Sequence, residues 1–161
     1  MLSTMERFLS RALTATFEEL ALICPDTKLS HAQSEAAVDV AVTVSFNGPL
    51  SGRLVLRASS EILPGIAENM LGADGEYSPA VQRDALGELA NVICGNLLPM
   101  MGGAEAVFVL SAPQEYRTGG EPHRCSPVAR ACIGIDNGRA VAQLLLSDDT
   151  LHSLELAAEA A

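Results

Sequence analysis

The segment SPAVQRDALGELANVICGNLL, residues 78–98, decides how the rest of this sequence is interpreted. Ser78 followed by Pro79 is a favoured opening for an α-helix, because the serine side chain caps free backbone amides and proline fits the first turn. Aliphatic residues then recur at the helical period, namely Leu86, Leu89, Ala90, Ile93 and Leu97. The segment therefore predicts a helix with one face in a hydrophobic core, and Pro99 is expected to stop or kink it.

The opposite face of this helix carries a line of polar or small residues. At about 100° per residue, four positions fall within about 60° of one another, and they are Asp84, Glu88, Asn91 and Gly95. A polar helix face is ordinarily just solvated. Here, however, both Asn and Gly disfavour helix interiors, and a glycine costs about 1 kcal/mol relative to alanine. Gly95 leaves clear space for an approaching partner, so this line is the candidate functional site.

Glu88 and Asn91 are three residues apart, so their side chains are neighbours on the helix surface. A carboxamide can hold a water molecule by donating one hydrogen bond and accepting another. Orienting the attacking water is a main task of a protein in phosphoryl transfer to water. A neighbouring carboxylate can bind a partner's ammonium group. The pair therefore suits hydrolysis of a phosphoryl group carried by another protein.

Other catalytic chemistries find little support in the sequence. The helix offers no hydroxyl nucleophile beside a base and no paired acids at glycosidase spacing. The three histidines, at positions 31, 123 and 152, lie far apart in sequence and form no triad or metal pattern. The four cysteines, at positions 24, 94, 125 and 132, show no C-x-x-C spacing, so neither a zinc site nor a redox dithiol is expected.

Composition and charge narrow the class of protein. The chain has 161 residues, is 48% hydrophobic and carries a formal net charge of −10, which argues against nucleic acid as a partner. Glu6, Glu18 and Glu19 interrupt the first twenty residues, so no signal peptide is expected there. No run approaches the roughly 18 apolar residues of a membrane helix, so we expect no membrane insertion and a cytoplasmic location.

The remaining periodicities predict a single α+β domain with an antiparallel sheet of about five to six strands packed with helices. An amphipathic helix is expected near residues 2–20, and the strict alternation at 36–46 is typical of a half-buried strand. Further elements are a strand at 50–58, a short helix at 59–72, a strand at 105–113, a hairpin of 128–135 with 139–146, and a final helix capped by Ser147. We expect residues 1–146 to form the main domain and 147–161 a helical extension of it.

The motif Asp84-x3-Glu88-x2-Asn91, followed by Gly95, Asn96 and later Pro113, resembles the active-site helix of the CheC/CheX/FliY family of chemotaxis phosphatases. The preceding strand and helix, and the VFVLSAP stretch that follows, resemble the same family over roughly residues 1–146. Only one E-x-x-N occurs, which resembles the single-site CheX-like branch.

The resemblance implies an activity, a partner and an architecture. The activity is hydrolysis of the phosphoaspartate of a phosphorylated CheY-type receiver domain. Glu88 would bind the receiver's lysine, Asn91 would align the attacking water, and Asp84, Gly95 and Pro113 would support the site. The resemblance also implies a three-layer fold, a homodimer and no cofactor in this chain, with Mg²⁺ held by the receiver.

Two alternatives stay open from the residues alone. One is a module that binds a receiver domain through the same face without hydrolysing the phosphoaspartate. The other is a structural component of a signalling or motor assembly. Asn91 separates the first alternative from the enzyme, because a surface used only for binding has no need of an amide that orients water.

Overall fold

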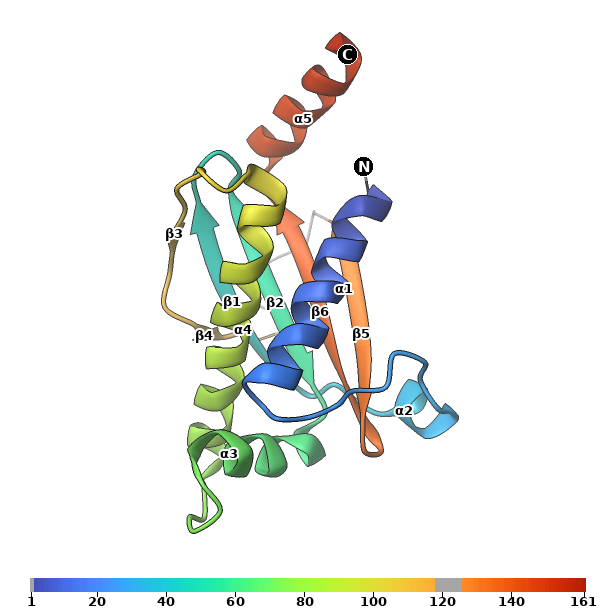
Figure 1. The fold of residues 1–161 in the computed structure, drawn as a ribbon, viewed down its shortest axis with the longest axis vertical. Coiled ribbons are helices and arrows are strands. Elements are labelled where there is room, and N and C mark those ends of the chain that lie inside the picture. Colours follow the sequence, from blue (N-terminus) through green and yellow to red (C-terminus); the bar gives the residue numbers. More distant parts are fainter. Residues whose placement is uncertain (1, 118–125) are drawn as a thin grey trace.

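An antiparallel β-sheet forms the centre of the computed structural model, which describes residues 2–117 and 126–161 (Figure 1). Its strands follow the order β3-β1-β2-β6-β5, and β4 also pairs with β1. The strands are β1 Val40–Asn47, β2 Gly52–Ala58, β3 Val109–Leu110, β4 Gln114–Glu115, β5 Ala129–Ile135 and β6 Gly138–Leu146. The prediction of one α+β domain with five to six antiparallel strands is confirmed.

Alternating side chains give the sheet one apolar face. In β1, Val42, Val44 and Phe46 are buried, and they lie on the same side as Leu54 and Leu56 of β2. The predicted hairpin of β5 and β6 is also present. Its turn places Asp136 at φ 50°, a left-handed conformation that a short polar residue tolerates.

Helices cover the apolar face. The long helices α1 (Leu2–Glu19) and α4 (Pro79–Gly102) lie side by side on it, as Figure 1 shows. Phe17 from α1 and Ile93 from α4 are fully buried in the resulting core. A short 3-10 helix, η1 (Ser60–Ile62), leads into α3 (Leu63–Leu71), which packs against α4. These contacts hold α4 in place from two sides.

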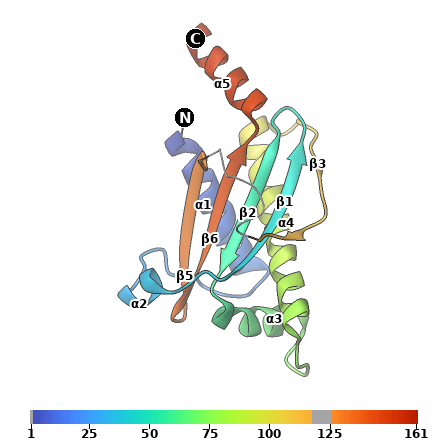
Figure 2. The ribbon, with the colours of Figure 1, turned by 180° about the vertical axis from the view of Figure 1, so that it is seen from behind.

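The other face of the sheet is covered by no helix of the described residues, as the view from behind shows (Figure 2). The short helix α2 (His31–Glu35) lies at the β5–β6 hairpin, and α5 (Asp148–Ala160) extends away from the body. The described chain thus forms two of the three layers that the resemblance implies. This second face is mixed in character, because Arg53, Arg57 and Gln143 are polar, whereas Tyr116 packs over a small buried cluster of Ala41, Val55 and Leu145.

Two sequence predictions about the region after residue 95 are wrong in detail. Pro99 does not stop the helix, because it lies in the last turn, where only one backbone hydrogen bond is lost, and α4 continues to Gly102. Of the predicted strand 105–113 only the two-residue strand β3 is present, and the two-residue strand β4 follows just beyond that range, where no strand is expected. Pro113 lies between them and has no N–H to donate to a ladder.

The predicted cap of the last helix and the predicted end of α3 are confirmed, whereas Ser59 makes no side-chain capping bond at the start of η1. The side chain of Ser147 accepts a hydrogen bond from the backbone amide of Thr150 at the start of α5, and Gly72 ends α3 at φ 111°. Within the two described ranges, no helix is long and apolar enough to cross a lipid bilayer.

Candidate functional site

Helix α4 is the platform of the candidate site. Ser78 caps it by accepting a hydrogen bond from the amide of Val81 at 3.3 Å, and Pro79 occupies the first turn as predicted. The inward side chains Leu86, Leu89, Ile93 and Leu97 have no solvent exposure. Burial on this scale fixes the rotation of the helix about its axis. The line that begins at Asp84 therefore faces outward.

The structure brings the predicted polar line together on the surface. Asp84, Glu88 and Gly95 are exposed and Asn91 is half-buried. In the described part of the chain, the side chains of Glu88 and Asn91 make no hydrogen bond or ion pair with other protein groups. An amide and a carboxylate without such bonds are available to a water molecule or a partner.

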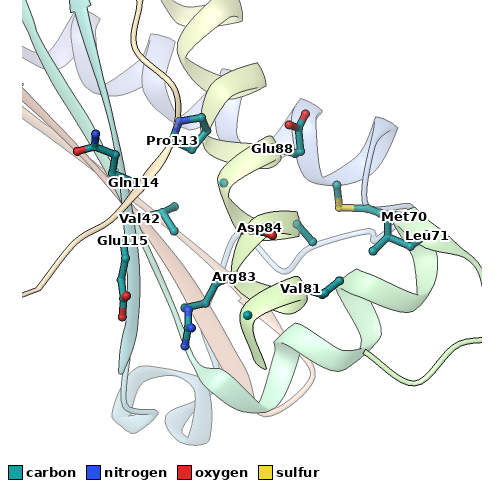
Figure 3. Close-up of a pocket in the computed structure, with 13 residues that line it drawn as sticks. Val42, Met70, Leu71, Val81, Arg83, Asp84, Glu88, Pro113, Gln114 and Glu115 are labelled. Carbon is teal, nitrogen blue, oxygen red and sulfur yellow. The ribbon is translucent and has the colours of Figure 1, made fainter. Parts of the chain in front are cut away.

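A groove of about 600 Å³ lies beside this line (Figure 3). One wall is α4 with Asp84 and Glu88, and a second is the end of α3 with Met70 and Leu71. The third wall is the segment from Pro113 to Glu115. Val42 of the central strand β1 also lines the groove. Asn91 and Gly95 are not part of the lining and lie on the following turns of α4, at the end of the groove marked by Glu88.

Pro113 packs directly against the backbone of α4 at Gly87. A β-carbon on Gly87 would lie 2.9 Å from the β-carbon of Pro113, closer than such atoms approach in proteins. Gly87 is therefore required by packing. The sequence shows that Gly87 is unusual in a helix, but it does not reveal this contact, because the two residues are far apart in the chain.

Gly95 has a different environment. A β-carbon there would meet nothing within 4 Å, and the residue keeps ordinary helical backbone angles. Neither packing nor backbone conformation within the described residues requires a glycine, although it costs about 1 kcal/mol in a helix. The observation agrees with the expectation that the position leaves clearance for a partner.

Asn96, the neighbour of Gly95, has a structural role. Its Nδ2 donates to Oγ1 of Thr16 at 3.4 Å, and Thr16 is buried where α1 packs against α4. The bond joins the two long helices. Asn96 is therefore directed toward α1, away from the exposed line.

The groove offers no side-chain nucleophile other than carboxylates. The described residues that line it include no serine, threonine, tyrosine, cysteine or histidine. Cys94 is on α4 but is fully buried, and burial raises its pKa to about 12. Its thiol thus stays protonated and out of reach. Water is the nucleophile that such a site can use.

Charge at the groove is mixed. Asp84, Glu88 and Glu115 contribute carboxylates, and Arg83 is the cation among the described lining residues. No group of three or more His, Cys, Asp or Glu residues in the described ranges could hold a metal ion. His31 and His152 lie on α2 and α5, apart from the groove lining, while His123 lies outside the described residues.

Comparisons with known proteins agree with this geometry. A family model described as chemotaxis phosphatase CheX matches residues 40–136, more than half of the chain. A search of the curated proteins gives no significant match.

Solved structures share the fold at low sequence identity. A CheX protein from Desulfovibrio desulfuricans is 18% identical with a TM-score of 0.68, covering 89% of this chain and 99% of that one. A chain of the CheX–CheY–BeF3–Mg²⁺ complex from Borrelia burgdorferi is 14% identical with a TM-score of 0.57, covering 88% and 97%. The FliM middle domain from Vibrio alginolyticus is 12% identical with a TM-score of 0.59, covering 95% and 96%.

Proposed function

Because the chain belongs to the CheX family of chemotaxis phosphatases, we propose that it hydrolyses the phosphoaspartate of a CheY-type receiver domain. The observation that carries the proposal is the pair Glu88 and Asn91 on the exposed line of α4, next to the open backbone of Gly95. A relative of the same fold is a CheX protein in a complex with CheY, which supports a receiver domain as the partner.

In the proposed reaction, the amide of Asn91 holds a water molecule in line with the phosphorus atom. The water oxygen forms a new bond to phosphorus while the bond from phosphorus to the aspartate oxygen breaks. The products are inorganic phosphate and a free carboxylate on the receiver. The contribution of Asn91 is orientation, which is a large part of the protein's task in such a transfer.

Glu88 is proposed to bind the ammonium group of the receiver's lysine. An ion pair of this kind would place Asn91 over the phosphoryl group, since Glu88 and Asn91 lie one turn apart. Asp84 would support the site from the preceding turn, and Pro113 would hold the third wall of the groove against Gly87. A divalent metal such as Mg²⁺ would be held by the receiver and not by this chain.

The alternative function is a receiver-binding module or a structural component. One observation keeps this alternative open. The FliM middle domain has the same fold at 12% identity, so the fold alone does not decide the activity. Asn91 argues for the enzyme. Its half-buried amide has no bond that a structural role would require within the described residues.

We further propose that the protein acts in the cytoplasm, where phosphorylated receivers occur, and that it works as a homodimer. Residues 147–161 are proposed to be an extension of the phosphatase domain. Helix α5 supports this view, because Leu151 and Leu154 at its base pack against the main core.

The direct experiment follows the loss of phosphate from candidate phosphorylated receivers with and without this protein. Faster loss from at least one receiver, at protein concentrations well below that of the receiver, would support catalysis. A receiver that binds the protein and keeps its phosphate at the spontaneous rate would support the binding module.

A further inference from the structure

The apolar stripe of α3 is longer than the core that it helps to form. Five apolar residues recur at the helical period along this helix, namely Leu63, Ile66, Ala67, Met70 and Leu71. The first three are buried, the fourth is half-buried and Leu71 is 53% exposed. The stripe therefore emerges from the core in the last turn of α3, and it ends beside the groove that Met70 and Leu71 line.

Val81 of α4 extends this apolar surface. At about 100° per residue, Val81 and Glu88 lie about 60° and about 40° to the same side of Asp84. Val81 is half-buried and lines the groove together with Met70 and Leu71. In Figure 3 these three apolar side chains are on the same side of α4 as Glu88, across the helix from the third wall. They form an apolar lip of the groove.

Leu71 has a special place among the exposed apolar side chains. In the part of the chain that the structure describes, it is the one exposed large apolar side chain that lines the groove. A single exposed leucine is ordinary, because much of any protein surface is apolar. Leu71, however, adjoins Met70 and shares the groove with Glu88, whose carboxylate makes no bond to another described group. An apolar patch beside an available charge is typical of a surface that binds another protein.

We propose that the apolar lip is a docking contact for the receiver domain and that Leu71 determines how tightly the receiver binds. The inference rests on the proposed function and adds a partner contact to the same site. The carboxylate of Glu88 favours a cation, and an apolar side chain of the receiver next to that cation would cover Leu71. The site therefore selects a partner that presents a cationic group flanked by an apolar side chain.

The lip contributes to binding and not to the chemical step. At about 1.5 Å per residue, Val81 lies about 15 Å from Asn91 along the helix axis. Apolar side chains also offer no group that can hold or polarise a water molecule. Contacts at the lip are thus equally strong before and during hydrolysis, so they lower KM and leave kcat unchanged. Leu71 is a residue that determines affinity, whereas Asn91 is the proposed catalytic residue.

The kinetic test compares Leu71→Ser with the unchanged full chain. The probe is a phosphorylated CheY-type receiver that the unchanged protein binds. Leu71→Ser should raise KM at least about fivefold with kcat unchanged, the scale expected when about half of a leucine side chain is no longer buried on binding. Leu71→Met keeps the apolar surface and should bring KM back to within about twofold of the unchanged protein.

Affinity is measured separately by fluorescence anisotropy, in proteins that also carry Asn91→Ala so that hydrolysis is slow during the titration. Leu71→Ser should weaken binding by the same factor at low and at high salt, because apolar contacts are not screened. The loss caused by Glu88→Ala should shrink as salt rises, because an ion pair is screened. A loss for Leu71→Ser that disappears at high salt would contradict an apolar contact.

Leu156→Ser is the matched control. Leu156 is also 53% exposed, but it lies on α5, at the other end of the molecule from α3 (Figure 1). Its substitution should leave KM and affinity unchanged. Circular dichroism and light scattering should show that each variant is folded and has the oligomeric state of the unchanged protein.

Three results would overturn the inference: Leu71→Ser binds and turns over as the unchanged protein does, Leu156→Ser has an equal effect, or Leu71→Ser changes only the oligomeric state. The last result would assign the lip to a second copy of this chain. A receiver that binds but keeps its phosphate would contradict the phosphatase function alone, and the anisotropy comparison would still test Leu71. Binding to none of the candidate receivers would overturn both proposals.

Discussion

The ring of Pro113 rests on the backbone of α4 at Gly87, where an added β-carbon would lie 2.9 Å from that of the proline. This contact joins the loop before β4 to the helix that carries Glu88 and Asn91. It also holds the segment that starts at Pro113 in place as a wall of the groove that Glu88 lines (Figure 3). The packing of this loop against α4, and with it the shape of the groove, therefore requires glycine at position 87.

Gly87→Ala should lower stability and activity together. Alanine adds about 1 kcal/mol of helix propensity, but overpacking against Pro113 costs about 1–3 kcal/mol, so the unfolding free energy should fall by roughly 1 kcal/mol. The displaced loop should also reduce turnover several-fold. Urea unfolding and receiver dephosphorylation measure the two effects, and a variant with higher stability and full activity would contradict the packing account.

Gly95→Ala is the matched substitution on the exposed side of the same helix, and it should raise stability where Gly87→Ala lowers it. With nothing within 4 Å of the new methyl group, the unfolding free energy should rise by about 1 kcal/mol. Turnover should fall if a partner approaches this backbone, and Gly95→Gln should lower it further. Full activity in both variants would show that the glycine provides no functional clearance.

Glu88→Ala should weaken receiver binding as well as turnover. Loss of an exposed ion pair alone costs up to about 1 kcal/mol, and a partly buried contact with the receiver's lysine would cost more. Affinity for the phosphorylated receiver can be measured by fluorescence anisotropy in the same buffer as the rate. Binding equal to that of the unchanged protein would remove Glu88 from the docking contact.

Gln33→Ala should destabilise the fold without affecting the site. The side chain is 2% exposed, its Nε2 donates to Asp26 and to the carbonyl oxygen of Asp136, and its Oε1 accepts from the amide of Ser30. Leaving such buried groups unpaired costs about 1–3 kcal/mol of unfolding free energy. The activity per folded molecule should stay unchanged. Ser34→Ala, an exposed change on the same helix, is the control for α2 itself.

Local patterns predict most of the fold. The alternation in β1, the period of α4 and the caps at Ser78 and Ser147 each follow from a few neighbouring residues, and the structure confirms them. The exposed line on α4 follows from the same period. These features depend on interactions that are short-range in sequence, which is why a single sequence is sufficient to predict them.

Features that depend on long-range contacts could not be predicted. Gly87 is explained only by Pro113, and the bond from Asn96 to Thr16 joins helices that are far apart in the chain. Strand β3 is shorter than expected and β4 is not predicted at all, because only the edge of β1 decides where these segments pair. The uncovered face of the sheet likewise follows from how whole elements pack.

The most direct test of the proposed function is a paired measurement on Asn91→Ala, of its dephosphorylation rate and its affinity for the same phosphorylated receiver. If Asn91 holds the attacking water, turnover should fall by about 100-fold, the scale of losing one well-placed catalytic hydrogen bond. Affinity should change much less, because the lost contact is to water, and the alanine should favour the helix. A variant that binds and turns over like the unchanged protein would show that the amide is not catalytic and would leave the binding module as the function.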